Sequence, residues 1–239
     1  MLAAGTPLQG GQRARSRLHS RLTLQPEADR LRRQLGQRFL ASGREVSTLI
    51  GTVTLGTERQ TARIVRRQDD DDERLTIALN GGPPTLTWSG LDGAKSNGNP
   101  ATDATRALIE RLALDSPDQF ILAQLRGSAY FTVSRLVRPS EAGGSDSYAG
   151  PVWNVVRISE PSGAAQSRPQ SSWRLYYLNA ATGLIDKALS QEQGQTITAE
   201  FSEWVNQGGE TLPARITWKL NNQVVMDLTI TNVTHSPKQ

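Results

Sequence analysis

The last third of the chain, residues 172–234, has the pattern of β-strands joined by short turns, without a helical segment. Apolar and polar residues alternate along it, as in Ile197, Ala199 and Phe201. Alternation with a period of two gives each strand one apolar and one polar face. Turn-forming residues separate the strands, as at 179–183 and 221–222. A meander of this length must close, pack against a second layer or curl into an open trough, because its apolar face has to be covered.

Length and composition fit a single globular domain. Of the 239 residues, 36% are hydrophobic and 21% are charged, and all-β domains of this size occur undivided. The formal net charge of +4 is uneven, because arginines crowd the start of the chain against only Glu27 and Asp29. Such a basic arm occurs in proteins that bind nucleic acid or anionic lipid, but it is more often a solvated leader followed by a helix. We therefore predict a flexible basic leader over 1–24 and one domain over 25–239.

The residues that the chain lacks exclude several kinds of site. The absence of cysteine removes disulfides, zinc–thiolate sites and thiol catalysis. No run of about 18 apolar residues occurs, so no transmembrane helix is expected. The opening Met1–Thr6 is too short for a signal peptide but resembles the small-residue end of one. Export and a cytoplasmic location are both compatible with these features.

Before the last third, the pattern switches between helix and strand. A helix is expected over 26–42, where apolar residues recur every four positions and arginines occupy the other face. Helical spacing returns over 97–125, with a second short helix beginning at Pro117. Strands are expected between and after these helices, at 46–55, 61–68, 74–79, 85–88, 129–138 and 152–158.

This order of elements predicts an α+β fold that is mainly β. A single antiparallel sheet of about 10–11 strands would be strongly curled, because strand twist accumulates across the sheet. With helices on one side only, the expected architecture is an unclosed half-barrel whose concave side is covered by the helices. Two long loops, at 139–150 and 160–171, are expected to join strands within this domain.

No catalytic or metal-binding motif is present. His19 and His235 lie near the chain ends and are expected to be exposed, whereas a serine–histidine–aspartate site needs a buried, oriented imidazole. The acidic run at 69–72 fails as an EF-hand loop, because Arg74 and Asn80 stand where glycine and glutamate are required. Glycine-rich phosphate-binding motifs are absent, and nothing favours a carboxylate pair for sugar hydrolysis. We therefore expect no enzymatic activity, no metal and no cofactor.

Four short motifs occur in an order that points to a known family. They are Ile64–Arg67 followed by a turn and 73–79, then Thr87–Gly93, then Tyr176–Leu184, then Gly208–Pro213. In this order they resemble the periplasmic outer-membrane lipoprotein carrier (LolA-like) superfamily, which includes envelope-stress sensors and mycobacterial lipid-binding lipoproteins. The resemblance covers residues 26–234 and is that of a divergent member.

The resemblance implies a cavity for acyl chains. The family fold is an unclosed β-barrel whose apolar concave face, covered by helices, shelters such chains. Burial of each methylene contributes about 0.8 kcal/mol, so an apolar trough holds lipid without specific polar contacts. An ordinary hydrophobic core is the alternative role for each candidate. The residues predicted to line the cavity are Ile64, Leu75, Ile77, Trp88, Phe131, Val133, Val155, Leu175, Phe201, Ile216, Trp218 and Leu228.

The resemblance also assigns a role to an arginine of the second strand. In the carrier family this arginine binds the helical lid and governs its opening, and Arg66 or Arg67 matches its position. Gln68 stands where the family usually has proline, and the acidic run follows it. A strand-face arginine paired with the acidic turn is therefore the other interpretation.

The function implied by the resemblance is binding of lipid or lipoprotein acyl chains by a monomeric, non-enzymatic protein of the periplasm or cell envelope. The alternative is a regulatory or protein-interaction module on the same fold, with envelope proteins as partners. Nucleic-acid binding by the basic leader is a third hypothesis, which we do not favour. A cavity filled by Trp88, Trp153, Trp173 and Trp218 would favour the interaction module.

Overall fold

The computed structural model describes residues 30–31, 33–34, 45–68, 73–89, 92–117, 119–120, 130–137, 151–159, 173–192, 194–207 and 210–237. Six strands precede the helix α2 (Asp103–Leu114): β1 (Glu45–Leu55), β2 (Glu58–Gln68), β3 (Glu73–Leu79), β4 (Leu86–Ser89), β5 (Gly93–Ser96) and β6 (Asn99–Pro100). Seven follow it: β7 (Tyr130–Val137), β8 (Trp153–Ser159), β9 (Trp173–Asn179), β10 (Ile185–Glu192), β11 (Gln195–Gln207), β12 (Glu210–Leu220) and β13 (Gln223–Pro237).

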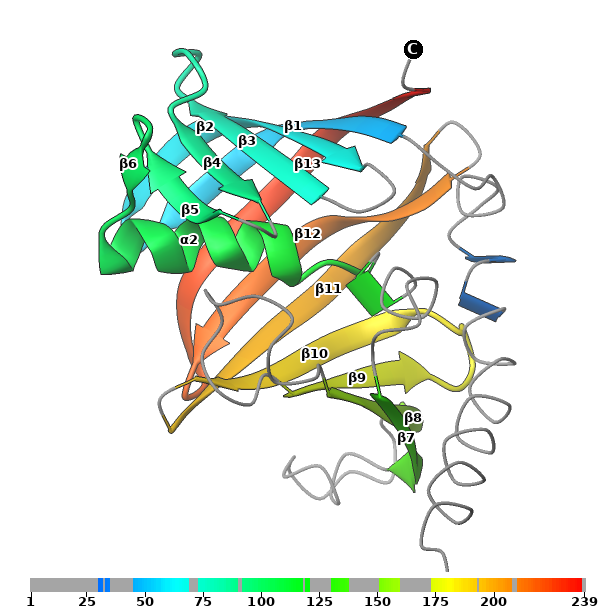
Figure 1. Ribbon diagram of the computed structural model, residues 1–239. Helices are drawn as coiled ribbons and strands as arrows, with labels where there is room; N and C mark the ends of the chain where they lie inside the picture. Colours follow the sequence, from blue (N-terminus) through cyan, green and yellow to red (C-terminus); the bar gives the residue numbers. More distant parts are fainter. Residues whose placement is uncertain are drawn as a thin grey trace, which may run out of the picture.

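All described strands belong to one 13-stranded sheet with the order β6-β5-β4-β3-β2-β1-β13-β12-β11-β10-β9-β8-β7 (Figure 1). The first six strands form one meander and the last seven form another. Antiparallel pairing of β1 with β13 joins the two halves. β6 and β7 are the two edges and do not pair with each other, so the sheet is unclosed. The mainly-β, unclosed antiparallel sheet expected from the sequence is confirmed.

The sheet has more strands than the 10–11 predicted, because the segment before α2 forms an extra hairpin. Asn97 and Gly98 both have left-handed backbones, with φ of 51° and 79°, and they join β5 to β6. An Asn-Gly pair is a strong hairpin signal. The prediction that helical spacing begins at residue 97 was therefore wrong, since α2 starts at Asp103.

Helix α2 packs against the sheet through its apolar stripe. Ile109, Leu112 and Ala113 are buried in the same core as the apolar side chains of the strands. Figure 1 shows α2 lying across one side of the sheet, beside β5 and in front of β12 and β13. Of the second predicted helix, Pro117, Gln119 and Phe120 are described and helical. No helix within the described residues is long and apolar enough to cross a membrane.

Only a few residues of the first predicted helix, 26–42, are described. Arg30, Leu31, Arg33 and Gln34 are helical. Leu31 is fully buried in the main core, and Arg30 Nη2 donates a hydrogen bond of 2.9 Å to the carbonyl oxygen of Ala181. The amphipathic character predicted for this segment agrees with these positions. The boundary between leader and domain lies outside the described residues.

Two apolar clusters lie on opposite faces of β8, β9 and β10. Tyr176 and Val156 belong to the main core, whereas Tyr177 and Val155 form a second, smaller cluster with Trp153. Consecutive residues of a strand point to opposite sides of a sheet, which explains the division. Helix α2 covers only the face that carries the main core.

Candidate ligand-binding site

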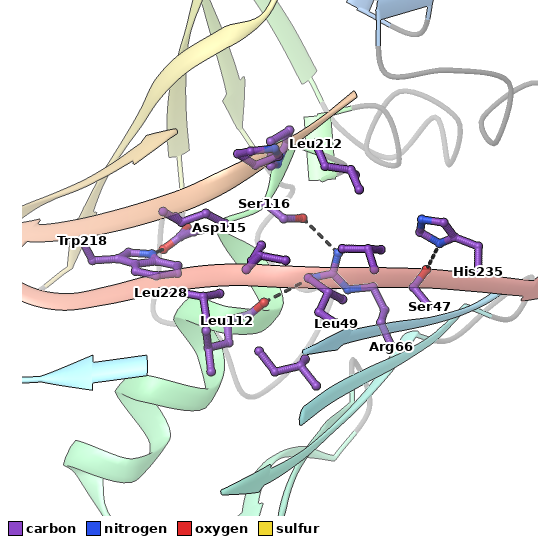
Figure 2. Close-up of a pocket in the computed structure, with 16 residues that line it drawn as sticks. Ser47, Leu49, Arg66, Leu112, Asp115, Ser116, Leu212, Trp218, Leu228 and His235 are labelled. Atoms are coloured by element: carbon purple, nitrogen blue, oxygen red, sulfur yellow. Dashed lines mark hydrogen bonds between the residues drawn. The ribbon is translucent and has the colours of Figure 1, made fainter. Parts of the chain in front are cut away.

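A pocket lies between the C-terminal end of α2 and four neighbouring strands, β2, β1, β13 and β12 (Figure 2). Its volume is about 60 Å³. Most of its lining is apolar: Leu49, Ile64, Leu112, Pro117, Leu212, Pro213, Ile216, Trp218, Leu228, Ile230 and Val233. The polar lining residues are Ser47, Arg66, Asp115, Ser116 and His235.

The register of β2, β1 and β13 places the lining residues of these strands in rows that run across the sheet. Ile64 of β2 lies opposite Leu49 of β1, which lies opposite Val233 of β13. Two residues further along, Arg66, Ser47 and His235 form a second row on the same strands. Residues two apart on a strand face the same side. A polar row therefore borders an apolar row at one end of the pocket.

The two strands at the far side of the pocket separate along their length. β12 and β13 pair from their hairpin only as far as Arg215 and Thr229. Beyond that point β12 continues beside β11 and β13 beside β1, and Figure 1 shows the two strands diverging. Leu212 on the β12 arm and Val233 on the β13 arm both line the pocket, so the pocket lies at this split in the sheet.

Arg66 fastens the end of α2 to the sheet. Its Nη1 donates to Ser116 Oγ (3.1 Å), and its Nη2 donates to the carbonyl oxygens of Leu112 (3.1 Å) and Ala113 (3.2 Å). The last carbonyls of a helix have no partner within the helix and carry partial negative charge, so a guanidinium is favourable there. Figure 2 shows the side chain reaching across the pocket to the helix end.

A buried carboxylate supports Arg66 from the neighbouring strand β3. Arg66 Nε lies 3.0 Å from Glu73 Oε1, and the two side chains are 11% and 2% exposed. Gln119 Nε2 donates to Glu73 Oε2 (2.9 Å) and also to the carbonyl oxygen of Ala113 (3.1 Å). The segment after α2 is thus bound to β3 as well as to β2, through polar groups that are almost fully withdrawn from water.

Asp115, the residue that ends α2, is held from the other half of the sheet. Trp218 Nε1 of β12 donates to its Oδ2 (3.2 Å), and Arg174 Nε of β9 lies 3.3 Å from its Oδ1. β2 and β9 are far apart in the strand order, yet Arg66 and Arg174 reach neighbouring residues at the same helix end. The sheet therefore curls around the C-terminal end of α2.

The predicted cavity-lining residues fall into three groups in the structure. Ile64, Ile216, Trp218 and Leu228 line the pocket. Leu75, Ile77, Trp88 and Phe201 are buried in the main core but do not line it. Val155 and Leu175 belong to the second cluster, on the opposite face of the sheet.

The placement of Val155 and Leu175 corrects the prediction for these two residues. In β8 and β9 both faces carry apolar side chains, so alternation alone does not identify the face that α2 covers. Val156 and Tyr176, the next residues in each strand, occupy the main core instead. Phe131 and Val133 belong to β7, but their side chains are not among those that the structure describes.

The structure separates the two candidate arginines. Arg66 points toward α2 and the pocket, whereas Arg67 is exposed and lies opposite Arg74 of β3. Both interpretations of the sequence describe part of what Arg66 does, because it binds the helix end and also pairs with a carboxylate close to the acidic run. Whether Arg66 governs opening stays a prediction.

Apart from Arg66, sequence reasoning missed the polar residues at the pocket. His235 was expected to be exposed, but it is half-buried and its Nδ1 shares a 2.9 Å hydrogen bond with Ser47 Oγ (Figure 2). The reason is that β13 is the longest strand and pairs with β1 as far as Pro237. In the sequence, Asp115 and Ser116 stand only at the boundary of a predicted helix. Nothing in the sequence indicates which strands carry the side chains that contact them.

The polar side chains at the pocket are engaged with other parts of the protein, and the rest of its lining is apolar. Among the described residues, no group of three or more His, Cys, Asp or Glu side chains could hold a metal ion. Arg66 is engaged with the helix end and Asp115 with Trp218. The surface left to a ligand is therefore mostly the apolar side chains of β1, β2, β12 and β13.

No protein-family model and no curated protein matches the chain. Among solved structures it is similar to a DUF1329 family protein from Desulfovibrio piger, with 9% sequence identity, a TM-score of 0.53 and coverage of 89% of this chain and 93% of that chain. It is also similar to a LolA superfamily protein from Nitrosomonas europaea, with 13% identity, a TM-score of 0.47 and coverage of 89% and 92%. The Pseudomonas aeruginosa MucA/MucB complex gives 15% identity, a TM-score of 0.27 and coverage of 90% and 58%.

At these sequence identities the similarity concerns the fold alone. The likeness to the DUF1329 family protein shows that this chain shares the fold of that protein. Membership of the LolA-like superfamily stays a prediction from the order of the motifs.

Proposed function

We propose that the protein binds the acyl chains of lipids or lipoproteins in the bacterial cell envelope and catalyses no reaction. In this proposal α2 and the segment after it form a lid over the concave side of the sheet. The observation that supports it best is the position of Arg66, which holds the carbonyl end of α2 above a pocket lined by apolar side chains. The fold class and the apolar lining fit a periplasmic or envelope location.

The size of the pocket implies that the lid must move. Ligand pockets usually measure about 300–1,000 Å³, whereas this pocket measures about 60 Å³. An acyl chain therefore enters only when the end of α2 leaves the sheet. The polar contacts that would break are few, chiefly those of Arg66, Glu73 and Asp115. The apolar packing of Leu112 and Ala113 against the sheet would be lost with them. Each methylene buried in their place would contribute about 0.8 kcal/mol.

Native mass spectrometry of the protein with added palmitate tests this proposal. We expect a one-to-one adduct with the wild-type protein and loss of the adduct in Leu228→Gln, because an amide in the apolar lining lacks a partner. Val224→Gln is the matched control, since Val224 lies on the same strand and is 58% exposed. Circular dichroism establishes that each variant is folded.

A second lining variant keeps the test decisive if Leu228→Gln does not fold. Ile230→Phe adds volume at a half-buried lining position without adding a polar group, and we expect it to exclude palmitate. Wild-type protein that forms no adduct with palmitate or with a diacylated lipopeptide would overturn the proposal. So would adducts that survive both lining substitutions.

The alternative function is a regulatory or protein-interaction module on the same fold. The small pocket volume favours it, because Trp218 and Ile216 already fill much of the space under α2. The tryptophan arrangement is only partly the one expected for a filled cavity, since Trp88 and Trp218 lie in the main core while Trp153 lies in the second cluster. Failure of the palmitate experiment would leave this module as the better account.

A further inference from the structure

The outer face of β2 carries a row of arginines that the pocket does not use. Arg59, Arg63 and Arg67, which we call the arginine stripe, are all exposed. They recur every four residues along the strand and so face the same side, with spacings of about 13 Å. Arg66 and Ile64 face the other way, toward α2 and the pocket. The arginine stripe therefore lies on the back of the proposed binding site.

The neighbouring strands offer these arginines no carboxylate. Arg63 lies between Ile50 of β1 and Ala78 of β3. Arg59 lies opposite Thr54 of β1. No ion pair to Arg59, Arg63 or Arg67 occurs within the described part of the chain. Within the described residues, the stripe is thus positive charge without an ion-pair partner on one face of the sheet.

Acidic residues lie near both ends of the stripe. Asp227 lies across from Thr54 on β13, but its carboxylate already accepts hydrogen bonds from Arg215 Nε (2.9 Å) and Thr217 Oγ1 (2.6 Å). The acidic run 69–72 follows Arg67 in the sequence. Glu58 precedes Arg59 in the sequence, so Arg63 is the member of the stripe that lies farthest along the chain from carboxylates.

An exposed apolar side chain accompanies the charge. Ile50 lies directly beside Arg63 and is 44% exposed. A large aliphatic side chain next to arginines suits a surface that offers both phosphate groups and hydrocarbon, as the membrane interface does. The wide spacing of the guanidinium groups suits many separate phosphates rather than one phosphate held by two arginines.

We propose that this face of β1 and β2 docks the protein onto a membrane of anionic phospholipid. The attraction is electrostatic, so it acts within a Debye length of the lipid headgroups and weakens as salt is added. This docking does not depend on the proposed acyl-chain pocket, because the stripe and the pocket are on opposite faces of the sheet.

Co-sedimentation of the full chain with vesicles tests the docking surface. With vesicles of phosphatidylcholine containing phosphatidylglycerol, we expect binding that weakens as sodium chloride is raised, and none with phosphatidylcholine alone. Arg59→Gln/Arg63→Gln should weaken binding about 30-fold, since each arginine near an anionic surface contributes about fivefold. Arg106→Gln/Arg157→Gln removes the same charge from exposed positions on α2 and β8 and should leave binding nearly unchanged.

Three outcomes would overturn the docking surface. If the two double variants weaken vesicle binding equally, the attraction depends on the net charge of the whole chain, including its basic start, and not on the stripe. Equal binding to both kinds of vesicle would remove the electrostatic basis. A loss of duplex DNA binding in Arg59→Gln/Arg63→Gln, with vesicle binding unchanged, would assign the stripe to nucleic acid. Palmitate binding by the same variants should stay at the wild-type level, which separates this test from that of the pocket.

Discussion

At the scale of single residues, Arg66 is the side chain on which the arrangement of the pocket depends most. It binds two carbonyl oxygens of α2, a hydroxyl after the helix and the buried carboxylate of Glu73. Removing one partner from a buried ion pair leaves the other charge without compensation in a poorly solvated place. Removing both partners avoids that penalty, so single and double substitutions should differ sharply.

We predict that Arg66→Leu lowers the free energy of unfolding by about 3–5 kcal/mol. Arg66→Leu/Glu73→Leu should recover a large part of this loss, because no unpaired charge then stays buried. Arg67→Leu is the matched control and should change stability by less than about 0.5 kcal/mol, since Arg67 is exposed. Urea unfolding measures all three, and a double variant no more stable than Arg66→Leu would contradict this account of the pair.

A second group of residues, on the opposite face of the sheet, should respond to pH. Lys187 Nζ lies 4.6 Å from the centre of the Trp153 ring and 4.5 Å from that of Tyr177. Burial lowers the pKa of Lys187, against the opposing effects of Glu200 and Asp186. Burial also raises the pKa of Tyr177. The two aromatic faces attract the ammonium form and so act against the lowering of the lysine pKa.

We predict that Lys187 makes the free energy of unfolding rise with pH below its ordinary pKa of 10.5. In that range the unfolded chain binds a proton that the folded protein has released, so folding gains as protons become scarce. Tyr177 acts in the opposite direction, and only above its ordinary pKa of 10.0. The free energy of unfolding of the wild type minus that of Lys187→Met should therefore become more positive from about pH 8 to about pH 10. A constant difference in urea unfolding would mean that the aromatic rings offset the desolvation.

At the scale of elements, the junction of β1 with β13 connects the two halves of the sheet. The pairing shifts register between Ile50 and Gly51, and the chains approach closely at this irregularity. A Cβ added at Gly51 would overlap the backbone carbonyl oxygen of Thr229. Backbone atoms cannot rotate away as a side chain can, so glycine is required here for close approach.

We predict that Gly51→Ala destabilises the protein by about 1–3 kcal/mol or more and loosens the β1–β13 junction. Gly98→Ala is the comparison, because its Cβ would enter open space and its cost of about 1–2 kcal/mol comes only from the left-handed backbone. Hydrogen exchange should quicken in β1 and β13 for the first variant and only near β5 and β6 for the second. Unchanged exchange in β1 and β13 would contradict the role given to Gly51.

At the scale of the whole molecule, local sequence pattern predicted the kind of fold but not the interior contacts. Turn residues and alternation were enough for an unclosed antiparallel sheet, since both are properties of short segments. These patterns do not identify the inner face of a strand whose two faces are both apolar. Val155 and Leu175 were therefore predicted on the face opposite to the one that they occupy. They also could not locate the pocket, because Arg66, Asp115 and His235 meet only through the curl of the sheet and the pairing of distant strands.

The central claim is that an acyl chain lies between the end of α2 and strands β1, β2, β12 and β13. Photolabelling with a fatty acid that carries a diazirine in mid-chain, followed by peptide mapping, tests it most directly. We predict that the label attaches to lining residues such as Ile216, Leu228 and Ile230. Label confined to exposed apolar residues such as Ile50, Val205 and Val224, or no saturable label at all, would contradict the claim.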